Sequence, residues 1–211
     1  MTFTVAVVTA GLSQPSSTKL LADRLSEAVS SRLSAADDDA LVELVDLRPL
    51  AHALADNLVT GFPPPELEAA VSAVIEADAL VAVTPIFAAS YSGLFKTFFD
   101  VLDKDALAGK PTLIAATAGT ARHSLALEHA LRPLFAYLRA VVVPTAVFAA
   151  TEDFGSTADG RLGERIDRAA DELVDLLRPR RDTTGPSARK TTPKRDPFED
   201  VTPFDQLLRG Q

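Results

Sequence analysis

The sequence predicts an α/β domain built around a parallel β-sheet. Short apolar runs rich in β-branched residues alternate with longer amphipathic segments, a rhythm typical of this class. The 211 residues suit one domain with an extension, and a hydrophobic fraction of 47% is ample for a full core. Cysteine is absent, which excludes disulfides and thiolate metal sites, and the 3 histidines lack a metal-binding spacing, so no metal site is predicted.

Five strands are expected, at residues 3–9, 41–46, 79–84, 112–117 and 141–149. The third run is almost entirely apolar and predicts a central strand covered on both faces, whereas the second alternates apolar and polar residues, as expected near an edge. Five helices are expected between and after them, at residues 17–33, 65–77, 92–102, 124–139 and 162–177, with an irregular segment over 48–65.

Strict alternation of five strands and five helices predicts a doubly wound sheet. The order 2-1-3-4-5 suits a polar second strand at the edge, which gives a flavodoxin-like three-layer sandwich with a five-stranded parallel sheet. In this order the loops after strands one, three and four converge on one crevice, where ligands of such sheets bind.

The first of these loops, residues 9–18, is rich in hydroxyl groups just before a predicted helix. The first N–H groups of a helix are unpaired and its dipole favours an anion, so Ser13, Ser16, Ser17 and Thr18 suit a phosphate. The alternative is ordinary capping by Ser16 or Ser17, which needs only one hydroxyl. The loop lacks both G-x-x-x-x-G-K-[ST] and G-x-G-x-x-G, which argues against a P-loop and a classical dinucleotide fold.

The other two loops follow the third and fourth predicted strands. Pro85 and Gly93 shape the loop after the third strand into a flat apolar slot suited to a planar heterocycle. Core packing explains Phe95, Phe98 and Phe99, while Phe87 and Tyr91 suit either the core or the slot. The third loop, residues 117–124, contains several small residues and a glycine, which permit close backbone approach to a ligand ring.

Five stretches in and near these loops form recognisable motifs: Pro15-Ser-Ser-Thr18, Thr84-Pro-x-Phe-x-Ala-x-Tyr-Ser-Gly-x-x-Lys-Thr-x-x-Asp100, Ala106-Leu-x-Gly-Lys110, Ala116-Thr-x-Gly-Thr120 and His123-x-x-Ala-Leu-x-x-Ala-Leu-x-Pro133. With these motifs the chain resembles the NADPH-dependent FMN reductase family of flavodoxin-like proteins. The resemblance is nearest to the reductase components of two-component flavin-dependent monooxygenases and extends over residues 5–148.

The resemblance implies an enzyme that transfers a hydride from NADPH or NADH to FMN and supplies reduced flavin to a partner monooxygenase. The cofactor carries this chemistry, so no catalytic side chain is expected. It also implies a homodimer or homotetramer. The FMN phosphate would be held by Ser13, Ser16, Ser17 and Thr18, and the ring and ribityl chain would be bordered by Pro85, Ile86, Phe87, Ala88, Thr117, Ala118, Gly119 and Thr120.

Two departures from the family pattern stand out. The first loop lacks the arginine that the family often has, which leaves Lys19 as the nearest cation and predicts a flavin that exchanges. His129 stands where the sulfonate reductases place a tyrosine associated with a helix bulge and tetramer packing; a plain surface histidine is the alternative. Two other functions stay open: a reductase of quinones or azo compounds with bound flavin, and an electron-carrier module without nicotinamide turnover.

The charge and the two ends of the chain complete the expectations. A net charge of -8 argues against a nucleic-acid partner, and no run is long enough for a membrane span, so a cytoplasmic protein is expected. Residues 1–178 form the predicted domain and 179–211 a basic, flexible tail. Apolar residues near its end form a hypothetical docking segment for a partner: Phe198, Phe204, Leu207 and Leu208.

Overall fold

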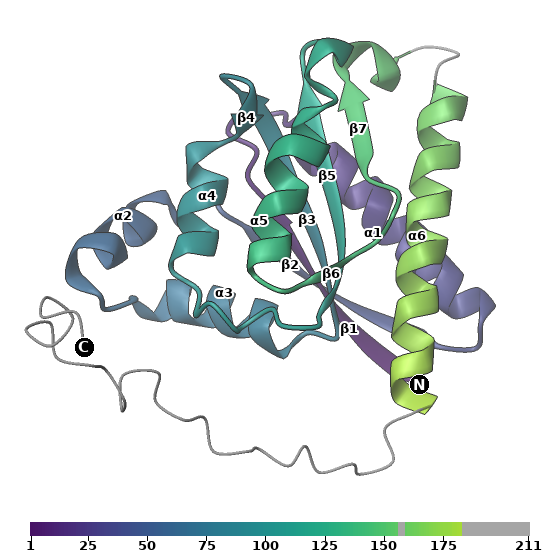
Figure 1. Cartoon of the computed structure of the whole chain (residues 1–211), viewed down its shortest axis with the longest axis horizontal. Coiled ribbons are helices and arrows are strands. Elements are labelled where there is room, and N and C mark those ends of the chain that lie inside the picture. The colour runs from purple at the N-terminus through teal and green to yellow at the C-terminus, as the bar shows by residue number, and fades with distance from the viewer. Residues whose placement is uncertain (156–158, 183–211) are drawn as a thin grey trace, which may run out of the picture.

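The computed structural model describes residues 1–155 and 159–182. A twisted central sheet lies between two layers of helices (Figure 1). Helices α1 (Ser17–Ala35) and α6 (Asp159–Asp182) cover one face. The other face carries α2 (Ala51–Thr60), α3 (Pro65–Glu76), α4 (Gly93–Asp100) and α5 (Arg132–Tyr137). The predicted parallel α/β architecture is therefore confirmed.

Seven strands form the described sheet, in place of the five expected. Its path runs β2-β1-β3-β5, and both β6 and β7 pair with β5, at its beginning and its end. All pairs are parallel except β3 with β4. The strands are β1 (Thr2–Thr9), β2 (Asp39–Asp46), β3 (Ala79–Phe87), β4 (Ser90–Tyr91), β5 (Pro111–Ala118), β6 (Val141–Val142) and β7 (Val147–Ala150).

Two hydrophobic cores fill the spaces between the layers, because successive side chains of a strand point to opposite faces. Val5 and Val7 of β1 face α1 and α6, while Ala6 and Val8 face the other layer. The predicted core phenylalanines are confirmed: Phe95, Phe98 and Phe99 are buried, and Phe99 packs 4.9 Å from the ring of Phe135 in α5.

The expected strand count is wrong for two physical reasons. Residues after β3 turn back immediately to form the short β4, where a loop was predicted. The predicted strand 141–149 is interrupted over residues 143–146, where Pro144 has no N–H to offer a ladder.

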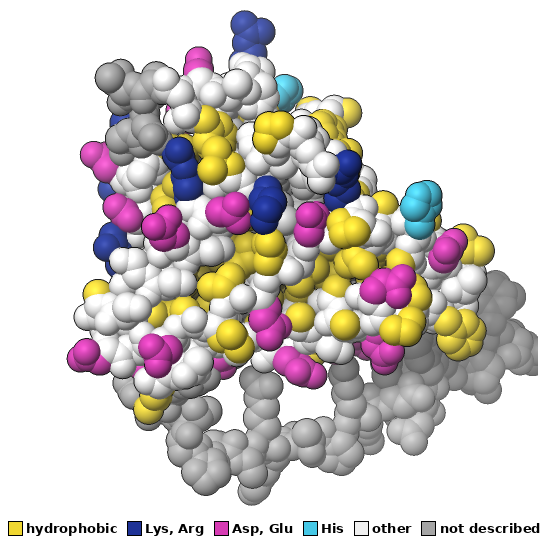
Figure 2. All heavy atoms as spheres, turned by 180° about the vertical axis from the view of Figure 1, so that it is seen from behind, with side chains coloured by type: hydrophobic (Ala, Val, Ile, Leu, Met, Phe, Trp, Pro, Cys, Tyr) yellow, Lys and Arg dark blue, Asp and Glu magenta, His cyan; other side chains and the backbone are white. Residues whose placement is uncertain are grey.

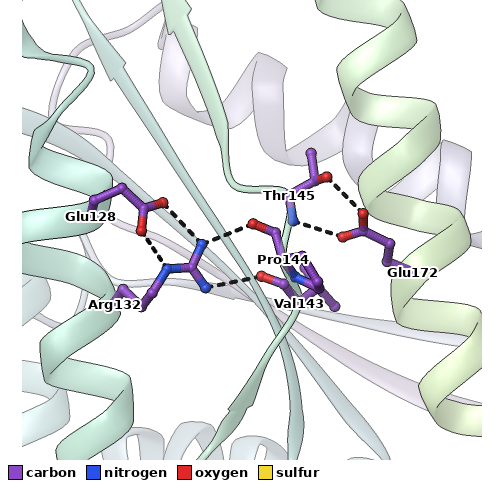
Figure 3. A network of polar contacts seen from close by, with 6 residues as sticks. All are labelled: Glu128, Arg132, Val143, Pro144, Thr145 and Glu172. Atoms are coloured by element: carbon purple, nitrogen blue, oxygen red, sulfur yellow. Dashed lines mark hydrogen bonds and ion pairs between the residues drawn. The ribbon is translucent and has the colours of Figure 1, made fainter.

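Charged side chains from both helical layers bind the segment between β6 and β7 (Figure 3). The Arg132 guanidinium donates to the carbonyl oxygens of Val143 and Pro144, each at 3.0 Å. From α6, the Glu172 carboxylate accepts from the Thr145 backbone N–H and hydroxyl, each at 2.7 Å. Backbone groups of residues 143–145, which would otherwise form hydrogen bonds between strands, are thus hydrogen-bonded to side chains.

Glu128 accepts two hydrogen bonds from the same Arg132 guanidinium, at 2.6 and 3.0 Å. This contact lowers the pKa of Glu128 and raises that of Arg132, since each charge is stabilised by the other. The bidentate pair orients Arg132 toward the break in the strand.

Helix predictions also needed correction. Residues 51–60 form α2 within the segment expected to be irregular. The helix predicted over 124–139 is divided into a π-helical turn at Leu127–Leu131 followed by α5. His129 lies exposed in that π-helical turn. The last helix is longer than the predicted 162–177, reaching from Asp159 to Asp182.

The outer surface is mixed in character, and Figure 2 shows apolar side chains among carboxylates on the face opposite to that of Figure 1. Edge strand β2 contributes exposed Leu41, Val42 and Leu44. Within the described helices, none is both long and apolar enough to cross a membrane. The predicted docking segment around Phe198 and Leu208 lies outside the described residues.

Candidate functional site

The carboxyl ends of β1, β3 and β5 lie side by side, at the upper edge of the sheet in Figure 1. The backbone N–H of Ala10 donates to Val83 O at 3.1 Å, and Pro85 of β3 stands opposite Thr117 of β5. The three segments singled out in the sequence therefore leave the sheet together.

The first loop is compact where it enters α1. A Cβ added to Gly11 would lie 2.0 Å from Ser16 Oγ, so this position needs a glycine. Ser16 is the N-cap residue, and its Oγ accepts from Lys19 N at 3.2 Å. Ser13 and Ser17 are exposed to solvent. The capping alternative therefore holds for Ser16, and it leaves the hydroxyls of Ser13 and Ser17 free to face a ligand.

Thr18 and Thr117 meet across the site, although 99 positions separate them in the chain. Their hydroxyl groups form a buried hydrogen bond of 2.8 Å between the first turn of α1 and the end of β5. This bond joins the first and third predicted loops. One role of these two hydroxyls in the structure is therefore to hold the two loops together.

The second segment is a tight hairpin. Ile86 and Phe87 pair with Tyr91 and Ser90, which leaves a two-residue turn. Both turn residues have positive φ, 46° at Ala88 and 67° at Ala89, where glycine or asparagine is usual, so the turn is strained. Such strain is often found beside ligands.

Side chains of the hairpin divide between core and surface. The Thr84 hydroxyl accepts from Ser92 N at 3.1 Å and so ties the returning chain to β3. Pro85 and Ile86 are buried, whereas Phe87 is 49% exposed. Tyr91 is half-buried, with its ring centroid 6.0 Å from that of Phe95. The sequence left open whether Phe87 and Tyr91 belong to the core or to the ligand slot. In the structure, Phe87 lies at the surface of the site and Tyr91 packs at the edge of the core.

The third segment becomes progressively exposed as it leaves β5. Thr117 is buried and Ala118 half-buried, while Gly119 and Thr120 are exposed. Thr120 caps a short 3-10 helix, Ala121–His123, by accepting from Arg122 N at 3.4 Å. Gly119 has open space around it, which leaves its backbone accessible.

A cavity of about 280 Å³ opens beside the first loop, between residues 11–20 and the end of β2. Thr9 lines it, and the Thr9 hydroxyl is buried without a hydrogen-bond partner among the residues that the structure describes. Asp46 and Arg48 also line it and were missed from the sequence. The available signal was Asp46, an acidic residue that closes the second strand.

These groups are of the kind that hold a phosphate-bearing ligand. The N-terminus of α1 offers N–H groups, two cations and two carboxylates line the cavity, and the Thr9 hydroxyl beside it lacks a partner within the described residues. Together with the sheet order, they define a flavodoxin-like α/β protein with its ligand edge at β1, β3 and β5.

The family is shown by comparison with known proteins. Residues 3–155 match the model of the NADPH-dependent FMN reductase family, to which the chain belongs. This family of oxidoreductases uses FMN and NAD(P)H.

Relatives match over most of their length. An FMN reductase (NADPH) of Pseudomonas aeruginosa is 37% identical over 83% of this chain and 92% of its own. An NADH-dependent FMN reductase, SfnF, of Pseudomonas fluorescens is 40% identical over 82% and 91%. The crystal structure of an oxidoreductase from Corynebacterium diphtheriae is similar with a TM-score of 0.82 and 53% identity, covering 84% of this chain and 98% of that one.

Proposed function

We propose that this FMN reductase binds FMN at the three segments described above and releases it, once reduced, to a flavin-dependent monooxygenase. The observation that carries the proposal is the buried Thr18–Thr117 hydrogen bond, since it holds the N-terminus of α1 against the end of β5. With the β3–β4 hairpin beside them, a helix N-terminus for a phosphate and a backbone edge for a ring belong to one site.

The chemistry that FMN would supply when bound is that of a hydride acceptor for NAD(P)H. The first loop would bind its phosphate through N–H groups of α1 and the hydroxyls of Ser13 and Ser17. Pro85, with no N–H, and the strained turn at Ala88 would shape the border of the ring. Gly119 would allow the backbone after β5 to close the other side.

Release of the flavin is supported by the exposed hydroxyl groups of the first loop and by its lack of an arginine. Ser13 and Ser17 are exposed, and the loop contains no arginine to clamp a phosphate. We also propose a homodimer or homotetramer, on the family resemblance, and a cytoplasmic location, where NAD(P)H is available as reductant.

The direct test is an anaerobic spectrum of purified protein mixed with FMN and NADPH or NADH. Rapid bleaching of the flavin, well above the rate without protein, is expected. No bleaching with either nicotinamide would reject the function.

Two further measurements separate the alternatives. Protein that is yellow as purified and active without added FMN would favour a quinone or azo reductase. Flavin binding without faster NAD(P)H oxidation would favour an electron carrier. Transfer is then tested by adding a flavin-dependent monooxygenase and measuring substrate oxidation.

A further inference from the structure

The cavity between the first loop and the end of β2 contains charges that the predicted flavin contacts do not use. Arg48 and Lys19 bring two cations to its wall, and Asp46 and Asp23 bring two carboxylates. Arg48 follows β2, which lies directly beside β1 in the sheet. The pairing of these strands therefore brings Arg48 to the first loop from a distant part of the sequence.

The two cations differ in how far they are already paired. Lys19 Nζ lies 3.5 Å from Asp23 Oδ1, one turn further along α1. The Arg48 guanidinium is exposed, and within residues 1–155 and 159–182 no carboxylate forms an ion pair with it. Arg48 is therefore the cation with its full hydrogen-bonding capacity available to a ligand.

A second and independent feature points to a ligand. Thr9 lines this cavity, and its buried Oγ1 has no hydrogen-bond partner within the described part of the chain. A buried hydroxyl without a partner is costly, and the cost is removed when a ligand oxygen completes the hydrogen bond. The exposed hydroxyl of Ser13 lines the same space.

We propose that this cavity is a phosphomonoester subsite in which Arg48 replaces the arginine missing from the first loop, with Thr9 and Ser13 as hydroxyl partners. An arginine fork and hydroxyl groups match a phosphate with three terminal oxygens. The ligand is the 5′-phosphate of FMN or the 2′-phosphate of NADPH, which share this chemistry. The proposal rests on the function proposed above and names how its site recognises phosphate.

The carboxylates set the strength of this subsite. Asp46 Oδ1 accepts from Arg48 N at 3.1 Å and so shapes the turn that carries Arg48. The negative charge of Asp46 opposes a phosphate in the same cavity, which keeps its binding weak and reversible. Replacement of Asp46 by asparagine keeps the acceptor and removes the charge.

The test is equilibrium binding, measured by fluorescence or calorimetry, of FMN against riboflavin and of NADP⁺ against NAD⁺. Each pair differs by one phosphomonoester. Arg48→Ala should weaken binding of one phosphorylated member about tenfold or more and leave its unphosphorylated partner unchanged. Asp46→Asn should strengthen the same member roughly threefold.

Arg168→Ala is the matched control, because it removes the same charge from the exposed face of α6. It should change none of the four affinities. A loss confined to FMN supports the subsite as the flavin phosphate site, and one confined to NADP⁺ supports it as the dinucleotide site.

Unchanged affinities, or equal losses for both members of a pair, would overturn the proposal. Because these readouts are binding constants, failure of the subsite leaves the bleaching test of the wild-type enzyme unaffected. Failure of that bleaching test would instead reject the function itself.

Discussion

Gly11 shows how closely the first loop folds upon itself, since the space where a Cβ would stand is filled by Ser16 Oγ. We expect Gly11→Ala to displace this capping hydroxyl and to lower the free energy of unfolding by about 1 kcal/mol, the usual value of an N-cap. Gly163→Ala in α6 is the control. It has open space and should raise stability by up to about 1 kcal/mol. Urea unfolding measures both.

The Thr18–Thr117 hydrogen bond lends itself to a double-mutant cycle. Thr18→Val or Thr117→Val alone leaves one buried hydroxyl without a partner and should cost about 1–3 kcal/mol of stability. The double variant removes both polar groups and should cost less than the sum of the single changes. Additive losses in chemical denaturation would show that the two hydroxyls do not interact.

Among the elements, the divided last strand depends on Arg132. Arg132→Met should lower the free energy of unfolding by about 1–3 kcal/mol, because the carbonyl groups of Val143 and Pro144 lose their donor. Lys96→Met is the control: it breaks only an exposed ion pair with Asp100 and should cost less than about 0.5 kcal/mol. Equal losses in thermal unfolding would contradict this role.

The ion pair of Glu128 with Arg132 predicts a pH dependence. The pKa of Glu128 is lowered in the folded protein, so its contribution is complete above the ordinary glutamate pKa and is lost as pH falls through the folded value. Glu128→Gln should therefore be about 0.5 kcal/mol less stable than wild type at pH 7. The difference should disappear at acidic pH, and a gap that persists below the glutamate range would argue against the assignment.

Local patterns predict the main elements well, because strand and helix periodicities are properties of short segments. Several of the features missed depend on hydrogen bonds that the local patterns do not show. The break after Val142 is held by Arg132 and Glu172, and the hairpin after β3 by the contact of Thr84 with Ser92. For α2, whose N-cap makes no side-chain hydrogen bond, the sequence carries a weak start signal.

Some features of the candidate site are also predictable from the sequence, and others are not. The position of the three loops follows from the order of β1, β3 and β5, which is predictable from the alternation of elements. The pairing of Thr18 with Thr117 is not, since two hydroxyls in different loops give no local sign of contact. Arg48 was likewise missed, because only the neighbouring position of β2 and β1 brings it to the cavity.

For the whole molecule, a ligand at this edge should stabilise the fold by mass action. FMN at 100 times its dissociation constant should add about 2.7 kcal/mol to the free energy of unfolding. For a domain of this size, that corresponds to a rise of roughly 5–10 °C in Tm. Differential scanning calorimetry with and without FMN measures it. An unchanged Tm at a concentration that saturates binding would contradict a site formed only in the folded chain.

Strand β2 has a consequence for the handling of the protein. Its edge presents Leu41, Val42 and Leu44 to solvent, a template on which another copy could add a strand. Carboxylates along the same strand, Asp39 and Glu43, repel such a copy at neutral pH. Replacing both by their amides removes this repulsion, so the double variant Asp39→Asn/Glu43→Gln should scatter more light than wild type at neutral pH and high protein concentration. Colloidal stability would then set the concentration limit for purification and storage, ahead of unfolding.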